Sequence, residues 1–207
     1  GPVAIESRRP ANGSAQDQPS AAPSSVGAAC AGLATNVTDN TAVVYTADHG
    51  DTMGCHRLFT KGFAFYEPAM RIPLIIRAPG ISRAGTRWDA LVESIDLYPT
   101  LMDLCQPGFT RTQHPLDGLS LRRLLDGSAQ SVREAAVSYW ERAVTVRTAT
   151  HRLIVTRTGS TWSGQELYDV RRTPDPVENL AGRQPDLVNH LLGFVPAMAD
   201  SKGPTRP

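Results

Sequence analysis

The stretch from Asp48 to Lys61 concentrates side chains that could act on a metal ion and an anion. Asp48 and His49 can both ligate a divalent cation, through a carboxylate oxygen and an imidazole nitrogen. Gly50 allows the backbone to turn sharply directly after this pair. His56 and Lys61 follow in the same loop, so a proton donor and a cation can return to the same place. The residue types therefore indicate a place where a metal ion, a cation and a proton donor could meet.

The element that must position this loop is the strand predicted over residues 42–46. This run is short, apolar and rich in β-branched residues, which is typical of a strand buried on both faces in a parallel sheet. In open α/β sheets, ligands bind just beyond the carboxyl ends of the strands. Asp48 and His49 stand at that position. We expect a second buried strand over residues 72–77, with Val43–Tyr45 and Leu74–Ile76 as neighbours.

The order of motifs around this loop resembles the C-terminal part of the sulfatase family, within the alkaline phosphatase superfamily. The pattern is most similar to choline sulfatases and phosphonate monoester hydrolases. The residues that carry the resemblance are Asp48-His49-Gly50, Gly54, His56, Lys61-Gly62, the run Arg71–Gly80, the run Ser94–Leu104, and Glu166-Leu167-Tyr168-Asp169 with Asp175-Pro176, Glu178, Asn179 and Leu180.

The resemblance implies a hydrolase of sulfate esters whose substrate is a small-molecule sulfate ester. It implies that Asp48 and His49 form the second half of a metal site and that Lys61 contacts the sulfate. His56 would donate a proton or lie behind the residues that touch the substrate. Family precedent favours Ca²⁺ as the metal, with Mg²⁺ or Mn²⁺ as alternatives. The family nucleophile is a formylglycine made from Cys or Ser.

The chain departs from the family pattern at its nucleophile. The motif has the form Cys or Ser, any residue, Pro or Ala, Ser, Arg, and none of Cys30, Cys55 and Cys105 starts it. The acidic pair that completes the family's metal site is also missing. We therefore expect a C-terminal fragment that is inactive alone. Two alternatives stay open, namely a phosphonate or phosphate ester hydrolase on the same scaffold and a non-catalytic, truncated or degenerate product.

Composition limits the other classes of function. The chain has 207 residues, 41% of them hydrophobic, and a net charge of +1, which suits an ordinary domain core. The near-neutral balance argues against a nucleic-acid partner. No apolar run is long enough to cross a bilayer, so no membrane partner is expected. The three cysteines indicate no disulfide framework. Oligomeric state and compartment stay open at this stage.

The predicted fold class is α/β, the C-terminal portion of an alkaline-phosphatase-like mixed sheet sandwiched by helices. A small antiparallel α+β subdomain follows, because short strands separated by polar turns recur after residue 131. Residues 1–25, rich in Pro, Ser, Ala and Gly, are expected to be a disordered leader. The α/β core would occupy residues 26–130, with a helix over 26–34, and the subdomain residues 131–207, with a helix over 185–192.

Overall fold

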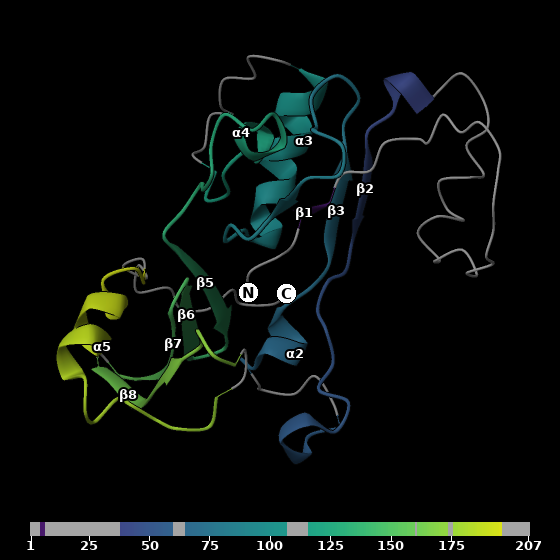
Figure 1. Ribbon diagram of the computed structural model, residues 1–207. Coiled ribbons are helices and arrows are strands. Elements are labelled where there is room, and N and C mark those ends of the chain that lie inside the picture. Colours follow the sequence, from purple (N-terminus) through teal and green to yellow (C-terminus); the bar gives the residue numbers. More distant parts are fainter. Residues whose placement is uncertain are drawn as a thin grey trace, which may run out of the picture.

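The computed structural model describes residues 5–6, 38–59, 65–106, 116–159, 161–173 and 176–195. They form an α/β part and a second part built on an antiparallel sheet, which lie side by side (Figure 1). The α/β part contains β1 (Ile5–Glu6), η1 (Thr38–Asn40), β2 (Val43–Thr46), η2 (Cys55–Arg57), α2 (Glu67–Met70), β3 (Leu74–Arg77), β4 (Arg87–Trp88), η3 (Ser94–Asp96), α3 (Leu97–Cys105) and α4 (Arg122–Leu125). The second part contains β5 (Ala135–Trp140), β6 (Ala143–Thr148), β7 (His151–Thr158), β8 (Thr161–Asp169) and α5 (Pro185–Leu192).

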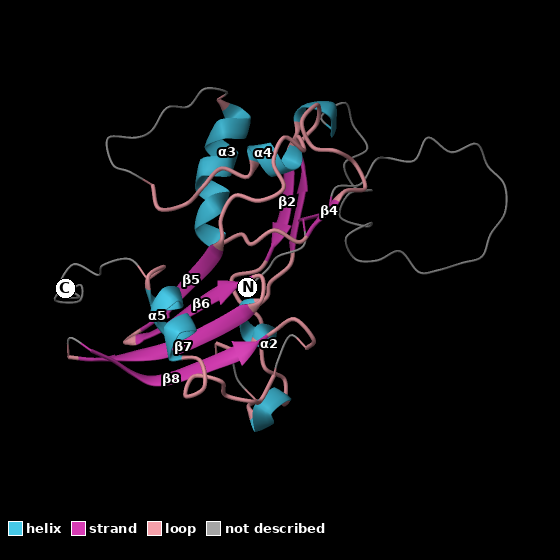
Figure 2. Cartoon of the chain, turned by 60° about the vertical axis from the view of Figure 1, so that its left-hand side comes forward, coloured by secondary structure: helices cyan, strands magenta, loops and turns pink. Residues whose placement is uncertain are grey.

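The first sheet is mixed, with the strand order β2-β3-β1-β4. The strand β1 runs parallel to β3, whereas β2 and β4 run antiparallel to their neighbours. The helices α3 and α4 cover one face of this sheet (Figures 1 and 2). Leu74 and Ile76 of β3 pack there against Leu121, Leu124 and Leu125, all of which are buried. The expected α/β architecture is confirmed.

The strand β2 differs from its expectation in two ways. It pairs with β3 as predicted, but the pairing is antiparallel, and β2 is an edge strand among the described elements. Its outer residues are open to solvent, and Tyr45 is 47% exposed. A strand of only four residues carries too little pattern to show how many neighbouring strands it has. Partners from elsewhere in the chain decide this.

The second sheet is an antiparallel meander in the order β5-β6-β7-β8, as predicted. Along β6, Val144 and Val146 point to the face that α5 covers, and they join Val188 and Leu191 in a second core. The helix α5 spans the residues predicted for it, because Pro185 is tolerated at the first helical position. Thr145 and Arg147 alternate with the valines and are buried too, so β6 is covered on both faces.

The strand β1 lies inside the stretch expected to be a disordered leader. Ile5 and Glu6 fill the gap between β3 and β4, where their backbone groups complete the sheet. Two residues have no periodicity that a sequence pattern could detect. The helix expected over residues 26–34 lies outside the described residues, as does the rest of that leader. Within the described ranges, no helix has the length and apolar character to cross a membrane.

Arg133 joins the α/β part to the start of the second sheet. Its guanidinium contacts the carboxylates of Glu93 and Asp96, and Glu93 also accepts a hydrogen bond from the backbone N–H of Val137 in β5. The carboxylate of Asp96 also accepts the backbone N–H groups of Glu93 and Leu119, both at 2.8 Å. Burial raises the pKa of Asp96 to about 6, and the Leu119 hydrogen bond opposes the shift.

Replacement of Asp96 by Ala is expected to destabilise the protein by about 3–5 kcal/mol, because Arg133 would stay buried without one of its carboxylates. The measurement is urea unfolding followed by circular dichroism. Asp89→Ala is the matched control, since its carboxylate is 87% exposed and lies 3.7 Å from Arg87. That control should stay within about 0.5 kcal/mol of the parent. Equal stability of the two variants would contradict a structural role for Asp96.

Candidate metal and anion site

Asp48 and His49 lie directly beyond the carboxyl end of β2, as predicted. The Nε2 atom of His49 is 3.4 Å from Oδ2 of Asp48, and the backbone N–H of His49 donates to Oδ1 of Asp48 at 2.9 Å. The other ring nitrogen of His49, Nδ1, lies 2.8 Å from the carbonyl oxygen of Gly50. A proton on Nδ1 would leave the Nε2 lone pair beside the carboxylate. One oxygen and one nitrogen ligand therefore lie next to each other at the surface.

Gly50 is required by a close approach of the loop to α2. Its N–H donates to the carbonyl oxygen of Ala69 at 2.9 Å. A Cβ atom at position 50 would lie 2.0 Å from the backbone oxygen of Pro68, far inside van der Waals contact. The sequence predicted a sharp turn as the reason for this glycine. The structure shows instead that the missing side chain allows Asp48 and His49 to be held against α2.

The loop then folds into a closed turn over residues 52–58. Thr52 is fully buried, and its hydroxyl donates to the carbonyl oxygen of Leu58 at 2.7 Å. The N–H of Gly54 donates to the same carbonyl at 2.8 Å. His56 and Arg57 adopt left-handed backbone conformations, with φ of 54° and 61°. Non-glycine residues in this region are strained, and they persist where surrounding contacts hold them.

His56 stacks on Tyr66, which immediately precedes α2. The two ring centroids are 3.9 Å apart and the planes are inclined by 10°. The guanidinium carbon of Arg152 lies 5.7 Å from the centre of the Tyr66 ring and 5.5 Å from that of Tyr168. Tyr66 thus links the predicted site residue His56 to a buried cation in the second sheet.

The helix α2 is anchored by its buried acid, Glu67. Its Oε1 atom accepts a hydrogen bond from Nε of Arg147 at 3.0 Å and lies 3.7 Å from a terminal nitrogen of Arg152. All three side chains are at most 10% exposed. Sequence reasoning missed Tyr66 and Glu67. Their partners lie in strands about eighty residues away in the chain, as for the Glu67–Arg147 bond, and local patterns do not report such contacts.

The structure brings two of the four predicted site residues together. Asp48 and His49 form a pair, whereas His56 packs on Tyr66, and Lys61 lies outside the described residues. In the described parts of the chain, no cluster of three or more His, Cys, Asp or Glu side chains is placed to hold a metal ion. Two ligands of one cation, bound at roughly 2.1–2.4 Å, lie about 3 Å apart. The Asp48–His49 pair fits that spacing, as part of a larger ligand set.

Comparison with known proteins gives a family match that includes this loop. The family model described as Sulfatase matches residues 25–107, which include the loop and both strands beside it. Over residues 25–107 the chain is therefore similar to the sulfatase family. The family resemblance predicted from the sequence is thereby confirmed. The greater closeness to choline sulfatases and phosphonate monoester hydrolases stays a prediction.

Two of the relatives that match this chain align with more than two thirds of its length. The chain is 33% identical over 153 residues to a Delta 4,5-hexuronate-2-O-sulfatase of Bacteroides thetaiotaomicron, a match to 69% of this chain and 31% of the relative. It is 32% identical over 160 residues to an N-acetylglucosamine-6-O-sulfatase of the same organism, covering 70% of this chain and 27% of the relative.

A solved structure shows the same fold. It is a protein in complex with its substrate D-glucosamine-2-N,6-O-disulfate, and it superimposes with a TM-score of 0.64 at 30% identity. The match covers 75% of this chain and 33% of that chain. The chain thus spans about a third or less of the length of these relatives.

Gly50→Ala is expected to destabilise the protein by about 1–3 kcal/mol, because the new methyl group would push the loop away from Pro68. The matched control is Gly182→Ala, whose added Cβ would meet no atom within 4 Å. Thermal unfolding of both variants and the parent gives the comparison. If Gly50→Ala unfolds at the temperature of Gly182→Ala, the loop does not depend on its contact with α2.

Proposed function

We propose that this chain is the C-terminal part of a sulfate ester hydrolase. The observation that carries the proposal is the Asp48–His49 pair, placed beyond the end of β2 within the segment that matches the sulfatase family. The relatives described above are named as sulfatases of sugars, which favours a small-molecule sulfate ester as the substrate. Fragment status is part of the proposal, as is the division at residues 26–130 and 131–207.

In this proposal Asp48 and His49 supply part of a metal site. Their ligand atoms Oδ2 and Nε2 are 3.4 Å apart, and the side chain of Asp48 is 85% exposed, so further ligands can approach. When bound, a divalent cation would neutralise charge on the nonbridging sulfate oxygens, with Ca²⁺ as our first choice and Mg²⁺ or Mn²⁺ as alternatives. The contact of Nδ1 with Gly50 fixes the direction in which the ring of His49 faces.

We propose that two further residues bind the anion and supply a proton to the leaving group. Lys61 would contact the sulfate group as a point charge. His56 would donate a proton to the leaving group or support a residue that does, and its stacking on Tyr66 restricts the ring to one orientation. This restriction matters, because a proton donor must lie within hydrogen-bond reach of the oxygen that it protonates.

The nucleophile must come from outside these residues. No Cys or Ser of the chain stands in the family's nucleophile motif, so a formylglycine would have to be supplied by another stretch of polypeptide. Without a nucleophile the covalent route is closed. A phosphonate or phosphate ester hydrolase on the same scaffold would need the same parts. A non-catalytic product would retain Asp48, His49 and Lys61 without a nucleophile.

We expect weak metal binding by this chain, with a Kd of about 1 mM or weaker, because calcium takes six to eight ligands and Asp48 and His49 supply two. Isothermal titration with CaCl₂ and MnCl₂ measures it. Asp48→Ala should abolish the remaining signal, whereas Asp89→Ala, a change to an exposed carboxylate elsewhere, should keep it. Micromolar binding would show that further ligands of the chain complete the site.

We expect no hydrolysis of 4-nitrophenyl sulfate by this chain alone, because it lacks the nucleophile motif. In a polypeptide that carries both these residues and a nucleophile motif, Lys61→Ala should lower kcat by about a hundredfold or more, the scale for losing one transition-state donor. Lys202→Ala, the change of a lysine remote in sequence, is the control.

Assays with 4-nitrophenyl sulfate and 4-nitrophenyl phosphonate separate the sulfatase from the alternative functions. Faster turnover of 4-nitrophenyl phosphonate than of the sulfate would favour the phosphonate hydrolase. Absence of turnover in the complete polypeptide would favour the non-catalytic product. Metal-dependent turnover by this chain alone, lost in Asp48→Ala, would contradict the proposed need for an external nucleophile.

A further inference from the structure

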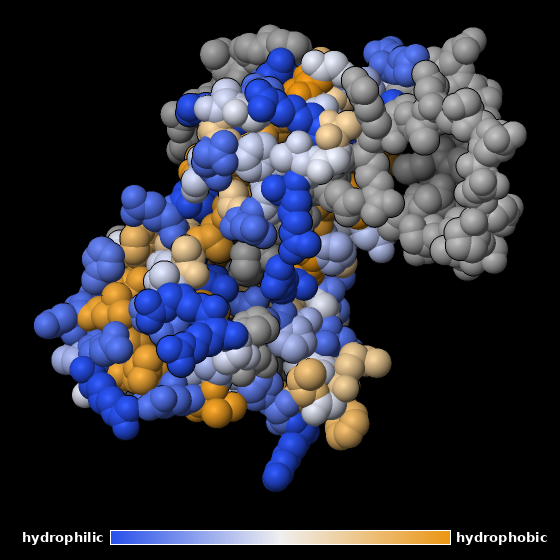
Figure 3. Space-filling model, in the orientation of Figure 1, coloured by the Kyte–Doolittle hydropathy of each residue, from blue (hydrophilic) through white to orange (hydrophobic). Residues whose placement is uncertain are grey.

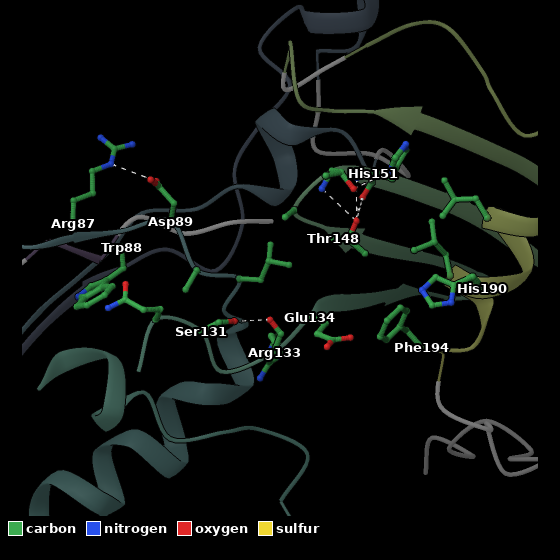
Figure 4. A pocket seen from close by; sticks show the side chains of 17 residues that line it. Arg87, Trp88, Asp89, Ser131, Arg133, Glu134, Thr148, His151, His190 and Phe194 are labelled. Carbon is green, nitrogen blue, oxygen red and sulfur yellow. Dashed lines mark hydrogen bonds and ion pairs between the residues drawn. The ribbon is translucent and has the colours of Figure 1, made fainter. Parts of the chain in front are cut away.

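An open groove of about 790 Å³ lies where the two parts of the molecule meet. Its walls are the end of β4, the segment leading into β5, the turn between β6 and β7, and α5 (Figure 4). No residue of the Asp48–His49 loop or of α2 lines it. The volume falls within the range of small-molecule sites, which often form at the junction of domains. The groove is therefore a second candidate site, with chemistry of its own.

The groove begins at the same end of the first sheet as Asp48. The strands β2 and β4 are each antiparallel to one of the parallel strands β3 and β1, so β2 and β4 run in the same direction. Asp89 follows β4 as Asp48 follows β2. Three strand spacings separate the two edges of the sheet, which amounts to about 14 Å.

Aromatic rings stand at opposite ends of the groove. Trp88 lies at the end formed by β4, and His190 and Phe194 lie at the end formed by α5 (Figure 4). His190 and Phe194 contact each other edge to face, with ring centroids 5.5 Å apart. Trp88 also packs against the first core, which holds its indole ring in place. These rings offer flat apolar surfaces that cost little conformational entropy on binding.

The polar groups of the groove form a balanced set. Arg87 lies 3.7 Å from Asp89, and Arg133 is occupied by Glu93 and Asp96. Glu134 is exposed in the middle of the groove and offers carboxylate oxygens as acceptors. The cations of the groove are thus matched by acids, and no excess of positive charge is left to attract an anion.

The imidazole of His151 adds a group that can both donate and accept. Its Nδ1 atom lies 2.9 Å from the hydroxyl oxygen of Thr150. Burial lowers the pKa of His151, the positive charges of Arg171 and Arg147 lower it further, and Asp169 opposes them. A lowered pKa favours the neutral ring, which has one nitrogen as donor and the other as acceptor.

We propose that this groove binds a neutral saccharide, with Trp88 against one sugar face and Glu134, His151 and His190 as partners of its hydroxyl groups. A saccharide presents patches of C–H groups beside hydroxyls that donate and accept, which matches aromatic ends combined with mixed polar walls. A purely apolar ligand would leave Glu134 and the imidazoles without partners at a cost in free energy. An inorganic anion would meet carboxylates as often as cations.

Isothermal titration of the full chain with two neutral disaccharides, lactose and N,N′-diacetylchitobiose, tests the proposal. We expect millimolar or tighter binding of at least one of them. Glu134→Gln should weaken that binding by about tenfold, the value of a hydrogen bond to a charged group. Glu141→Gln is the matched control, because Glu141 is also exposed but lies outside the groove. Its affinity should equal that of the parent.

Trp88→Phe provides an independent variant that keeps an apolar ring against the core. It should weaken sugar binding several-fold, whereas Trp140→Phe, a change to an exposed tryptophan of the second sheet, should not. Absence of sugar binding at roughly 10 mM would overturn the proposal, as would unchanged affinity in both Glu134→Gln and Trp88→Phe. Binding of inorganic sulfate in the groove, strengthened by Glu134→Gln because a repelling carboxylate is removed, would equally overturn it. None of these outcomes depends on hydrolytic activity.

Discussion

The buried ionic contact between Glu67 of α2 and the arginines of the second sheet is the constraint on which the rest of the arrangement depends. A carboxylate and two guanidinium groups are removed from water here, at a desolvation cost that only close pairing can offset. Arg147 donates to Glu67 at 3.0 Å, while the Oε2 atom of Glu67 has no hydrogen-bond partner within the described residues. Such a contact does little for stability relative to an apolar core, but it allows only one placement of α2 on the sheet.

The position of the candidate metal site follows from this placement of α2. The helix α2 accepts the N–H of Gly50 through Ala69 and presents Tyr66 to the ring of His56. The position of Asp48 and His49 is therefore set less by the strand that precedes them than by a helix fixed from the opposite side. An edge strand with an exposed outer face would not by itself restrict a loop that is solvated on one side.

Two ionic contacts among the described residues join the two parts of the molecule, and the groove proposed to bind a saccharide lies at the same junction. Glu67 forms one of these contacts with Arg147. Arg133 forms the other with the carboxylates of Glu93 and Asp96. Because Arg133 lines the groove, the contact that joins the parts also shapes that site. The metal loop and the groove thus share a supporting frame while using different side chains. The proposed metal site and the proposed saccharide site can therefore be altered by separate mutations.

The sequence by itself determined the elements whose signals are local. The strands of the meander, the helix Pro185–Leu192 and the placement of Asp48-His49 beyond a strand all follow from short patterns of apolar, polar and turn residues. The motif order also predicted the resemblance to the sulfatase family that the match over residues 25–107 confirms. Only the tertiary structure decided that β2 is an antiparallel edge strand, that Ile5–Glu6 completes the sheet, and that Gly50 is needed for contact with Pro68. It also decided the partners of Glu67 and Asp96. These features depend on residues distant in the chain. The sequence around an acidic residue does not show whether its carboxylate faces solvent or a buried arginine.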